Sequence, residues 1–435
     1  MTAVASHAER IAIVGSGIAG LTCAHVLGPT HDVVLFEADD RLGGHVNTVD
    51  VEDAAAGTLG VDTGFIVHND RTYPNLVALF AELGVATIDT TMSFAVTDRD
   101  PGSPTFGVTY RASSPNSWFA DRRNVVRPAI WRMVRDVVRF HHAANEFLES
   151  PDDSTTLAEM LADGKYSREF VDLHLIPLGS AVWSADPATF AEFPARSLLS
   201  FLSNHGLLSI ANRPQWRAVR GGSRVYVDAL ASRFQGSIRL SAGVEHVRRS
   251  DDGVIVETST QRECFDRVIL AVHADQALRM LVDPTPAERE VLGAIRFQPN
   301  QATLHTDTAL LPPRPRAWAA WNYDRRGPVG TTTITYDMTA LQHLAGRDRY
   351  LVSLNSDEWI DRRSVIASFD YAHPVFDLGA IAAQRRFLEI DGTRGVHYCG
   401  AWWGYGFHED GMVSALRVCD RIGAMGSAHR KVVLK

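Results

Sequence analysis

Three glycines at a fixed spacing are the residues of this sequence best suited to holding a ligand. Gly15, Gly17 and Gly20 follow an apolar run at residues 11–14 in the pattern G-x-G-x-x-G. In such a pattern the first glycine allows a tight turn, the second lets the backbone approach a pyrophosphate, and the third allows close helix packing. Glu37 follows about 20 residues later, where an acid can bind ribose hydroxyls. The spacing therefore predicts a dinucleotide-binding site.

A strand, a helix and a second strand must position these residues. We expect a strand at residues 11–14, a helix at 18–27 stopped by Gly28-Pro29, and a second strand at 33–36. The helix would direct unpaired N–H groups and the positive end of its dipole at the phosphates. The alternative is a small-residue turn at another strand-to-helix junction, but the order of strand, helix, strand and acid favours the dinucleotide. The contacts predicted from this unit are Gly15, Ser16, Gly17, Ile18, Ala19, Gly20, Glu37 and Ala38.

A second glycine pair distinguishes between nicotinamide and flavin dinucleotides. Arg41-Leu42-Gly43-Gly44-His45 follows the acid, where a nicotinamide domain has no reason to place two glycines. The element resembles the R-x-G-G segment that follows the ribose acid in FAD enzymes of the amine oxidase and phytoene desaturase superfamily. The sequence contains no second G-x-G-x-x-G pattern. This resemblance implies FAD rather than NAD and argues against a built-in NAD(P)H domain.

A third glycine-rich segment lies further along the chain. Residues 399–412 read Cys-Gly-Ala-Trp-Trp-Gly-Tyr-Gly-Phe-His-Glu-Asp-Gly-Met, between an expected strand at 396–399 and an expected helix at 413–422. In the same superfamily this helix start approaches the flavin ribityl chain and pyrimidine end. The aromatic residues of the segment have the alternative role of packing an interdomain core.

The complete set of motifs resembles a bacterial group of predicted NAD/FAD-binding proteins within the amine oxidase superfamily. The set adds Asp62-Thr63-Gly64-Phe65 to the three glycine-rich segments. Members are similar to the flavin domain fused ahead of plant cyclopropane fatty acid synthases, and bacterial ones are typically encoded beside cyclopropane-type lipid methyltransferases. The resemblance implies a fatty acyl or lipid substrate and a lipid methyltransferase as a partner. The further FAD contacts that it implies are Arg41, Gly43, Gly44, His45, Thr63, Gly64, Phe65, Val244, Gly400, Gly406, Gly411 and Met412.

The dinucleotide-binding motifs lie in separate parts of the sequence, which predicts two domains that each contain several segments of the chain. We expect an α/β fold in which a Rossmann-type FAD-binding domain is interleaved with an α+β substrate domain, the amine oxidase or p-hydroxybenzoate hydroxylase-like architecture. The FAD-binding domain is predicted at residues 1–87, 214–295 and 389–435, and the substrate-binding domain at 88–213 and 296–388. The choice of substrate is expected to lie in these two inserts.

Composition argues against several classes of protein. The 435 residues are 45% hydrophobic and 22% charged, as in an ordinary soluble globular protein, and the net charge of −8 gives no global attraction to nucleic acid. The four cysteines form no C-x-x-C pair and the 17 histidines form no metal-ligand spacing, so neither a disulfide framework nor a metal site is expected. Since there is no signal-peptide pattern and no run of about 18 apolar residues, a cytoplasmic location is expected.

One departure from the superfamily concerns how the flavin is held. Cys399-Gly400-Ala401 stands where Ala-Gly-Glu is common, so a carboxylate that helps to hold the flavin is missing there. Glu409 or Asp410 either replaces it or serves as a helix cap. Cys399 is expected at a strand end and Cys23 on a buried helix face, so neither supports a covalent link. FAD is therefore expected to bind noncovalently.

A second departure concerns lysine. Many amine oxidases place a lysine, through a water, next to flavin N5. The three lysines of this sequence are Lys165, Lys431 and Lys435, in a polar segment of the insert and in the tail. None is placed where that lysine belongs, so ordinary amine oxidation is disfavoured.

Candidate acid–base residues follow from the chemistry of an acyl chain. Oxidation in the middle of such a chain needs an apolar tunnel that brings a C–H bond to the flavin, and a base or water for the second hydrogen. The candidates are His408, Tyr405 and His68, with Tyr336 as a further proton donor or acceptor. For each histidine a structural hydrogen-bonding role is the alternative.

The expected function is an FAD-dependent oxidoreductase that oxidises or desaturates an unsaturated or methyl-branched fatty acyl chain. One alternative is an amine or other small-molecule oxidase, and another is a redox-neutral double-bond isomerase, which needs no external electron acceptor. A noncatalytic flavin-containing partner of a lipid methyltransferase is the alternative from a different class.

An amphipathic segment in the first insert suggests contact with a membrane. Residues 128–142 show helical periodicity, with Arg132, Arg135 and Arg139 within one arc and apolar residues opposite. Such a basic face on an acidic protein could rest on anionic lipid headgroups at the inner membrane face. The alternative is a solvated arginine face on a helix that packs against its own domain.

Overall fold

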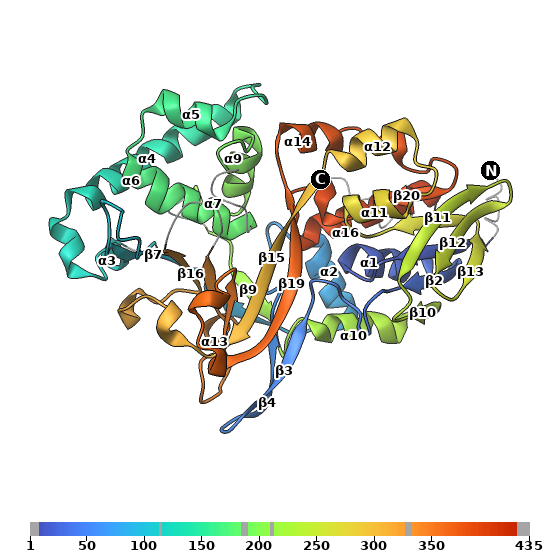
Figure 1. Cartoon of the computed structure of the whole chain (residues 1–435), viewed down its shortest axis with the longest axis horizontal. Coiled ribbons are helices and arrows are strands. Elements are labelled where there is room, and N and C mark those ends of the chain that lie inside the picture. Colours follow the sequence, from blue (N-terminus) through green and yellow to red (C-terminus); the bar gives the residue numbers. More distant parts are fainter. Residues whose placement is uncertain (1–7, 113–114, 184–189, 209–212, 327–332, 424–435) are drawn as a thin grey trace.

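A five-stranded parallel sheet is assembled from three separated parts of the chain. The computed structural model describes residues 8–112, 115–183, 190–208, 213–326 and 333–423 and is shown in Figure 1. The strand order is β10-β2-β1-β14-β20, and each neighbouring pair is parallel. The strands are β1 (Arg10–Val14), β2 (Asp32–Phe36), β10 (Ser237–Arg239), β14 (Arg267–Leu270) and β20 (Val396–Tyr398).

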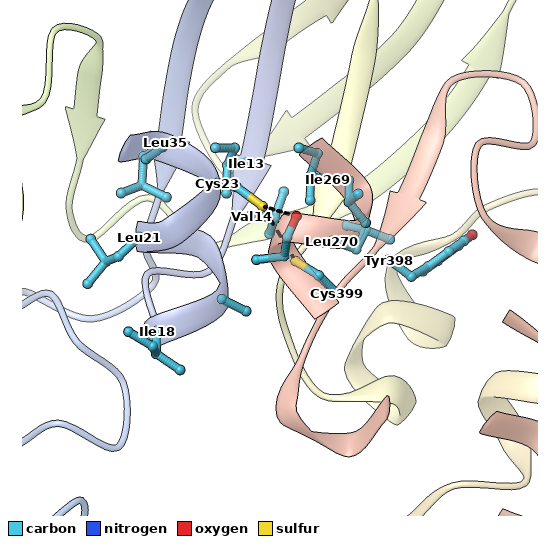
Figure 2. Close-up of a cluster of buried hydrophobic side chains, with 14 of the residues drawn as sticks. Ile13, Val14, Ile18, Leu21, Cys23, Leu35, Ile269, Leu270, Tyr398 and Cys399 are labelled. Atoms are coloured by element: carbon cyan, nitrogen blue, oxygen red, sulfur yellow. Dashed lines mark hydrogen bonds between the residues drawn. The ribbon is translucent and has the colours of Figure 1, made fainter. Parts of the chain in front are cut away.

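Two helices with adjacent N-termini pack together against this sheet. Helix α1 (Ile18–Leu27) has the bounds predicted from the sequence, whereas α16 (His408–Ile422) begins five residues before the predicted start at 413. Figure 2 shows the core between α1 and the parallel sheet, where the sulfur atoms of Cys23 and Cys399 lie 3.9 Å apart. The cysteines of this core, Cys419 included, are free thiols and buried. The other helices of this half of the molecule are α2 (Pro74–Leu83), α10 (Arg224–Arg233), α11 (Ala274–Met280), α12 (Pro286–Gly293), α14 (Leu378–Gln384) and α15 (Phe387–Ile390).

A small antiparallel sheet extends the parallel one near the acid Glu37. Its strands are β11 (Val244–Ser250), β12 (Gly253–Thr258) and β13 (Arg262–Phe265), which pair in sequence order. Strands β11 and β12 form a hairpin in which Ser250 lies opposite Gly253. The backbone N–H of Ala242 donates to the Glu37 carbonyl oxygen at 2.8 Å, so the start of β11 lies against the end of β2.

A seven-stranded mixed sheet forms the centre of the other half of the molecule. The order is β19-β15-β18-β17-β16-β7-β8, and only the β16–β7 pair is parallel. The long pair formed by β15 and β19 runs between the two halves (Figure 1). The strands are β7 (Phe94–Asp98), β8 (Thr109–Arg111), β15 (Arg296–His305), β16 (Trp321–Arg325), β17 (Ile334–Asp337), β18 (Leu351–Leu354) and β19 (Val365–Val375), with α13 (Met338–Leu341) following β17.

A group of helices lies beyond one edge of this sheet (Figure 1). The predicted amphipathic helix at 128–142 is confirmed as α4 and extends to Glu149, and Ile130 and Met133 on its inner face are fully buried. The five-residue segment Val171–Leu175 has the wider turn of a π-helix. The helices are α3 (Pro115–Trp118), α4 (Pro128–Glu149), α5 (Leu157–Gly164), α6 (Arg168–Phe170), α7 (Ile176–Trp183) and α9 (Ala195–Asn204).

The buried carboxylate of Asp62 joins segments that are far apart in the sequence. It accepts hydrogen bonds from the Thr48 hydroxyl at 2.6 Å, the Ser223 backbone N–H at 2.8 Å and the Gln342 side-chain amide at 3.1 Å. Burial raises the pKa of Asp62 to about 6. Asp62 ends the hairpin of β3 (Thr48–Asp53) and β4 (Gly57–Asp62), beside a three-stranded sheet of order β5-β9-β6. These strands are β5 (Val67–Asn69), β6 (Thr87–Thr90) and β9 (Trp216–Val219).

Candidate functional site

The three glycines of the first motif play different steric roles at the N-terminus of α1. A Cβ atom at Gly15, whose φ is +97°, would lie 2.7 Å from the Ala271 carbonyl oxygen, and one at Gly20 would lie 1.9 Å from the Gly15 carbonyl oxygen. A Cβ atom at Gly17 would have no neighbour within 4 Å. Gly15 and Gly20 therefore allow close packing, whereas Gly17 leaves open space at a helix N-terminus, where an anion is favoured.

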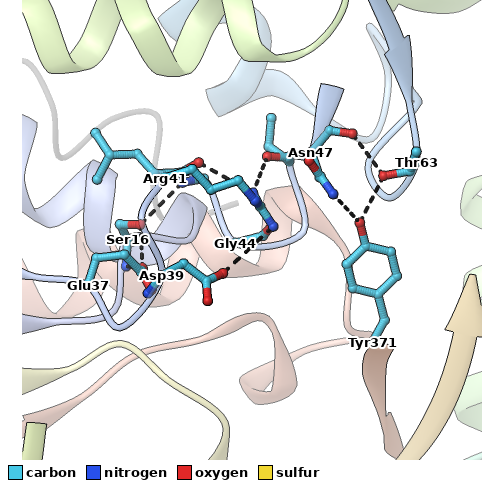
Figure 3. A network of polar contacts seen from close by, with 11 residues as sticks. Ser16, Glu37, Asp39, Arg41, Gly44, Asn47, Thr63 and Tyr371 are labelled. Carbon is cyan, nitrogen blue, oxygen red and sulfur yellow. Dashed lines mark hydrogen bonds and ion pairs between the residues drawn. The ribbon is translucent and has the colours of Figure 1, made fainter. Parts of the chain in front are cut away.

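The acid at the end of β2 lies beside this helix start. The Glu37 carboxylate accepts a hydrogen bond from the Ser16 backbone N–H at 2.8 Å and from the Asp39 backbone N–H at 3.0 Å (Figure 3). A Cβ atom at Gly243 would lie 3.5 Å from the Ala38 Cβ, so the start of β11 with Val244 adjoins the acid. Glu37, Ala38 and Val244, which are all predicted FAD contacts, thus lie together, although their contacts with FAD stay a prediction.

The Arg41 to His45 loop covers the N-terminus of α1. The Gly43 backbone N–H donates to the Ser16 carbonyl oxygen at 3.1 Å, and a Cβ atom at Gly44 would lie 3.3 Å from the Gly17 Cα. The Arg41 guanidinium donates to the carbonyl oxygens of Gly44 at 3.0 Å and Val46 at 3.1 Å. The arginine therefore holds the shape of the loop, and the two glycines bring its backbone close to the helix.

The motif Asp62-Thr63-Gly64-Phe65 pairs with the same loop. The Phe65 backbone N–H donates to the His45 carbonyl oxygen at 2.9 Å, and a Cβ atom at Gly64 would lie 2.1 Å from that oxygen. The Thr63 hydroxyl lies 2.9 Å from the hydroxyl of Tyr371, a residue of β19 (Figure 3). Gly64 is thus required because a side chain would collide with the His45 backbone. Thr63 connects the motif to the mixed sheet through Tyr371.

The N-terminus of α16 meets that of α1. A Cβ atom at Gly411 would lie 2.8 Å from the Ile18 side chain, so the two helix starts are in contact. Gly406 has a φ of +92° and packs against Phe376, and the Gly400 N–H donates to the Ser414 hydroxyl at 2.9 Å. Met412 is buried in the core beside them.

The two acids of this segment are engaged as helix caps. The Glu409 carboxylate accepts hydrogen bonds from the backbone N–H groups of Asn75 at 2.9 Å and Leu76 at 3.1 Å, at the start of α2. The Asp410 carboxylate accepts from the Phe407 backbone N–H at 2.9 Å, and burial raises the pKa of Asp410 to about 7. Of the two roles left open by the sequence, these contacts favour the cap.

The three candidate acid–base residues lie in apolar surroundings. His408 stacks on Phe65 with ring centroids 3.6 Å apart, its Nε2 lies 3.0 Å from the Tyr226 hydroxyl, and burial lowers its pKa to about 3. His68 is buried against Phe80, and burial lowers its pKa to about 4.

Burial also raises the pKa of Tyr405, and the Tyr405 carbonyl accepts a hydrogen bond from the Trp183 indole at 3.1 Å. All three candidates are therefore uncharged near neutral pH. The Nδ1 atom of His68 is buried without a hydrogen-bond partner among the described residues. Their roles in catalysis stay a prediction.

A partly buried cluster of three histidines lies at the same loop and was not foreseen from the sequence. The His45 ring lies 6.0 Å from that of His273 and 5.4 Å from that of His373, and it stacks on Tyr371 at 4.8 Å. Burial lowers the pKa of His45 and of His273, and lowers that of His373 to about 4. No group of His, Cys, Asp or Glu in the described part of the chain is arranged to hold a metal ion.

Aromatic side chains pack against the glycine-rich segment that precedes α16. Trp183, Phe201, Tyr405 and Phe407, here called the aromatic wall, join α7 and α9 to that segment. Ring centroids are 4.5 Å apart for Trp183 and Phe201, and 4.7 Å for Phe201 and Phe407. The wall is thus a packed apolar cluster that joins the helical group to the start of α16.

The residues fit an FAD molecule. Two adjoining helix N-termini, open space at Gly17 and a half-buried carboxylate at Glu37 are what a pyrophosphate and a ribose require. Gly44 and Gly411 lie directly against this helix start, and the motif at residues 62–65 adjoins it through the His45 backbone. Fold and site together define a flavoprotein of the amine oxidase type.

Comparison with known proteins identifies the family. Residues 18–423 match the family of flavin-containing amine oxidoreductases, and the chain belongs to it. Amine oxidase [flavin-containing] A of Canis lupus familiaris is 25% identical over 318 residues, which are 67% of this chain and 55% of that protein. The chain thus spans about half the length of the curated relatives that it matches.

Solved structures confirm the α/β fold. The cyclohexylamine oxidase from Brevibacterium oxydans has a TM-score of 0.67 at 16% identity and covers 96% of this chain and 100% of its own. A CLA-producing fatty acid isomerase from P. acnes has a TM-score of 0.68 at 15% identity, with 97% and 99% covered. The prediction of a flavoprotein oxidoreductase is confirmed by the family, which implies FAD.

Two further expectations concern lysine and the membrane. Lys165 ends α5 in a left-handed conformation with a φ of 48°, within the group of helices, and Lys431 and Lys435 lie outside the described residues. Among the described helices, none combines the length and apolar character needed to cross a bilayer. The predicted domain boundaries stay a prediction.

Proposed function

We propose that this flavoprotein oxidises or desaturates an unsaturated or methyl-branched fatty acyl chain, with FAD bound noncovalently. The observation that carries the proposal is the aromatic wall, because it places apolar side chains against the predicted flavin-binding segment directly before α16. Trp183 and Phe201 are buried, and their partners Tyr405 and Phe407 come from the predicted flavin-binding segment itself. An acyl chain has no charge to recognise, so such a surface suits it.

The uncharged state of the candidate acid–base residues supports the same substrate class. A hydride and a proton leave adjacent carbons when a double bond forms, and FAD, when bound, supplies the acceptor for the hydride and its two electrons. The chain itself must exclude water and accept the proton. Burial lowers the pKa of His68 and of His408, so both rings are neutral and place no charge beside an apolar chain.

Two related functions have support of their own. A redox-neutral double-bond isomerase is favoured by the structural likeness to the P. acnes fatty acid isomerase. Oxidation of an amine is favoured by the names of the curated relatives, although no lysine of the described chain lies beside the two helix starts. The resemblance to a group encoded beside lipid methyltransferases supports such an enzyme as a partner, and a noncatalytic role beside it is the remaining alternative.

Anaerobic mixing of the FAD-loaded protein with candidate substrates separates these functions. Long-chain unsaturated and methyl-branched fatty acids, free and as phospholipids, are compared with primary amines while flavin absorbance and products are followed. Bleaching by an acyl substrate with a new double bond supports the proposal, and product without bleaching indicates isomerisation. Bleaching by amines alone overturns the acyl proposal.

A pair of tyrosine variants tests whether the Tyr405 hydroxyl takes part in the reaction. Tyr405→Phe keeps the ring and removes the hydroxyl, so we expect a slower bleaching step at unchanged flavin content. Tyr166→Phe is the matched control, since Tyr166 packs on Phe140 and Phe170 among the helices. Equal rates in both variants would remove Tyr405 from the reaction.

A further inference from the structure

We infer that the outer face of α4, with the turn that precedes it, is a docking surface for an anionic lipid bilayer. The outer face is defined by Val125, Val126, Trp131, Arg132, Arg135 and Val138. It lies among the helices at the end of the molecule away from the parallel sheet (Figure 1). This inference does not depend on the substrate of the flavin site, because it can be tested without turnover.

Exposed apolar side chains are concentrated on this face. Val126 is 81% exposed, Trp131 52%, Val138 48% and Val125 47%. A shallow groove of about 440 Å³ runs between Val125, Val126, Pro128, Trp131, Arg132 and Arg135. Soluble proteins expose large apolar side chains singly as a rule, so four on one helix and its leading turn indicate a partner.

The inner face of α4 packs into the hydrophobic core. Ile130, Met133, Phe140 and Ala144 are buried with at most 2% exposure. On the outer side the Trp131 indole N–H donates to the Val125 carbonyl oxygen at 2.9 Å, which fixes the ring against the preceding turn. Because the indole N–H is already hydrogen-bonded, the exposed part of the Trp131 ring is apolar.

Charge on the outer face is arranged with cations outside and carboxylates beneath them. Arg132 pairs with Glu169, and Arg135 and Arg139 pair with Asp136 at 3.2 and 2.8 Å. The arginine side chains are 45 to 61% exposed, whereas that of Glu169 is 17% exposed and that of Asp136 is fully buried. The surface that a partner meets is therefore positive, although the whole chain carries a net charge of −8.

A bilayer with anionic headgroups matches this combination better than an acidic protein does. Apolar side chains can enter the acyl boundary while neighbouring arginines keep their guanidinium groups at headgroup level. Each such arginine contributes about a fivefold gain in affinity for an anionic surface. A partner protein would instead need a surface complementary in shape to the groove. The experiment below distinguishes a bilayer from such a protein.

Vesicle flotation with the full FAD-loaded protein tests the inference. Vesicles of phosphatidylglycerol and phosphatidylcholine are compared with vesicles of phosphatidylcholine alone, at low and high salt. We expect binding to the anionic vesicles that weakens with salt, and quenching of fluorescence by brominated lipid that Trp131→Phe reduces. Absence of wild-type binding to anionic vesicles overturns the inference and favours a protein partner.

Matched variants locate the surface. Val126→Asp should lower binding about tenfold or more, and Arg132→Gln with Arg135→Gln about 30-fold at low salt. The controls are Leu388→Asp, at a side chain 69% exposed, and Arg362→Gln with Arg363→Gln, at an exposed pair. Arg139 still pairs with Asp136 in the arginine variant, so the buried carboxylate keeps a partner. Equal losses in variants and controls would overturn the assignment of this face.

Discussion

Replacing Gly17 by alanine tests where the FAD pyrophosphate lies. The backbone at Gly17 has a φ of −63° and a ψ of 178°, which alanine adopts readily, and its Cβ would have no neighbour within 4 Å. The apoprotein should therefore be unharmed, with a gain of about 0.4–1 kcal/mol from the stiffer unfolded chain. If the phosphates occupy this space, the new methyl group must collide with them.

The expected loss of flavin affinity follows from the cost of overpacking. Forcing a methyl group into a filled site costs about 1–3 kcal/mol, which corresponds to about a 5- to 150-fold rise in the FAD dissociation constant. Since FAD stabilises only the folded state, a 100-fold loss removes about 2.7 kcal/mol of ligand-dependent stability under saturating conditions. Fluorescence titration of the apoprotein and its melting temperature with and without FAD measure both quantities.

Two further glycine variants make the result interpretable. Gly293→Ala is the neutral control, because its Cβ would lie an ordinary 3.8 Å from Leu278. Gly20→Ala should destabilise the apoprotein itself, because its Cβ would lie 1.9 Å from a backbone oxygen. If Gly17→Ala binds FAD as tightly as the wild type does, the pyrophosphate does not lie at the α1 N-terminus and the reasoning fails.

Two other variants probe charged and titratable groups. His373 has a folded pKa of about 4 against an ordinary 6.5, so the folded state gains stability when the ring is neutral. That gain, ~3 kcal/mol at most, is present above pH 6.5 and lost as pH falls toward 4, and His373→Asn should flatten the dependence of melting temperature on pH over this range. Glu409→Ala should lower the free energy of unfolding by about 2–4 kcal/mol, because the N–H groups of Asn75 and Leu76 lose their acceptor. Chemical denaturation measures it, and a loss below about 0.5 kcal/mol would contradict the cap.

The sequence predicts the elements whose signals are local. The strand, the glycines and the helix at residues 18–27 were placed correctly, since turn chemistry and helix capping act over a few residues. The start of α16 was placed too late, because Gly411 reads as a loop glycine until its contact with Ile18 is known. That contact joins segments far apart in the sequence, and no local pattern encodes it.

The residues missed at the site depend on tertiary pairing. Tyr371 and His373 alternate along β19, and this two-residue period was the available signal. Nothing near them indicates that His45, in the glycine loop, is their neighbour. The same holds for Glu409, whose partners at the start of α2 lie in a distant part of the chain.

The order in which the parallel sheet is assembled has a consequence for biosynthesis. Strand β20 pairs with β14 at the edge of the sheet, and α16, which follows β20, packs on α1 from the beginning of the chain. Contacts between such distant segments form late and slow the folding reaction. We expect the flavin site to form only after α16 has been synthesised and can pack on α1, so the cofactor joins the chain after both helix starts are present.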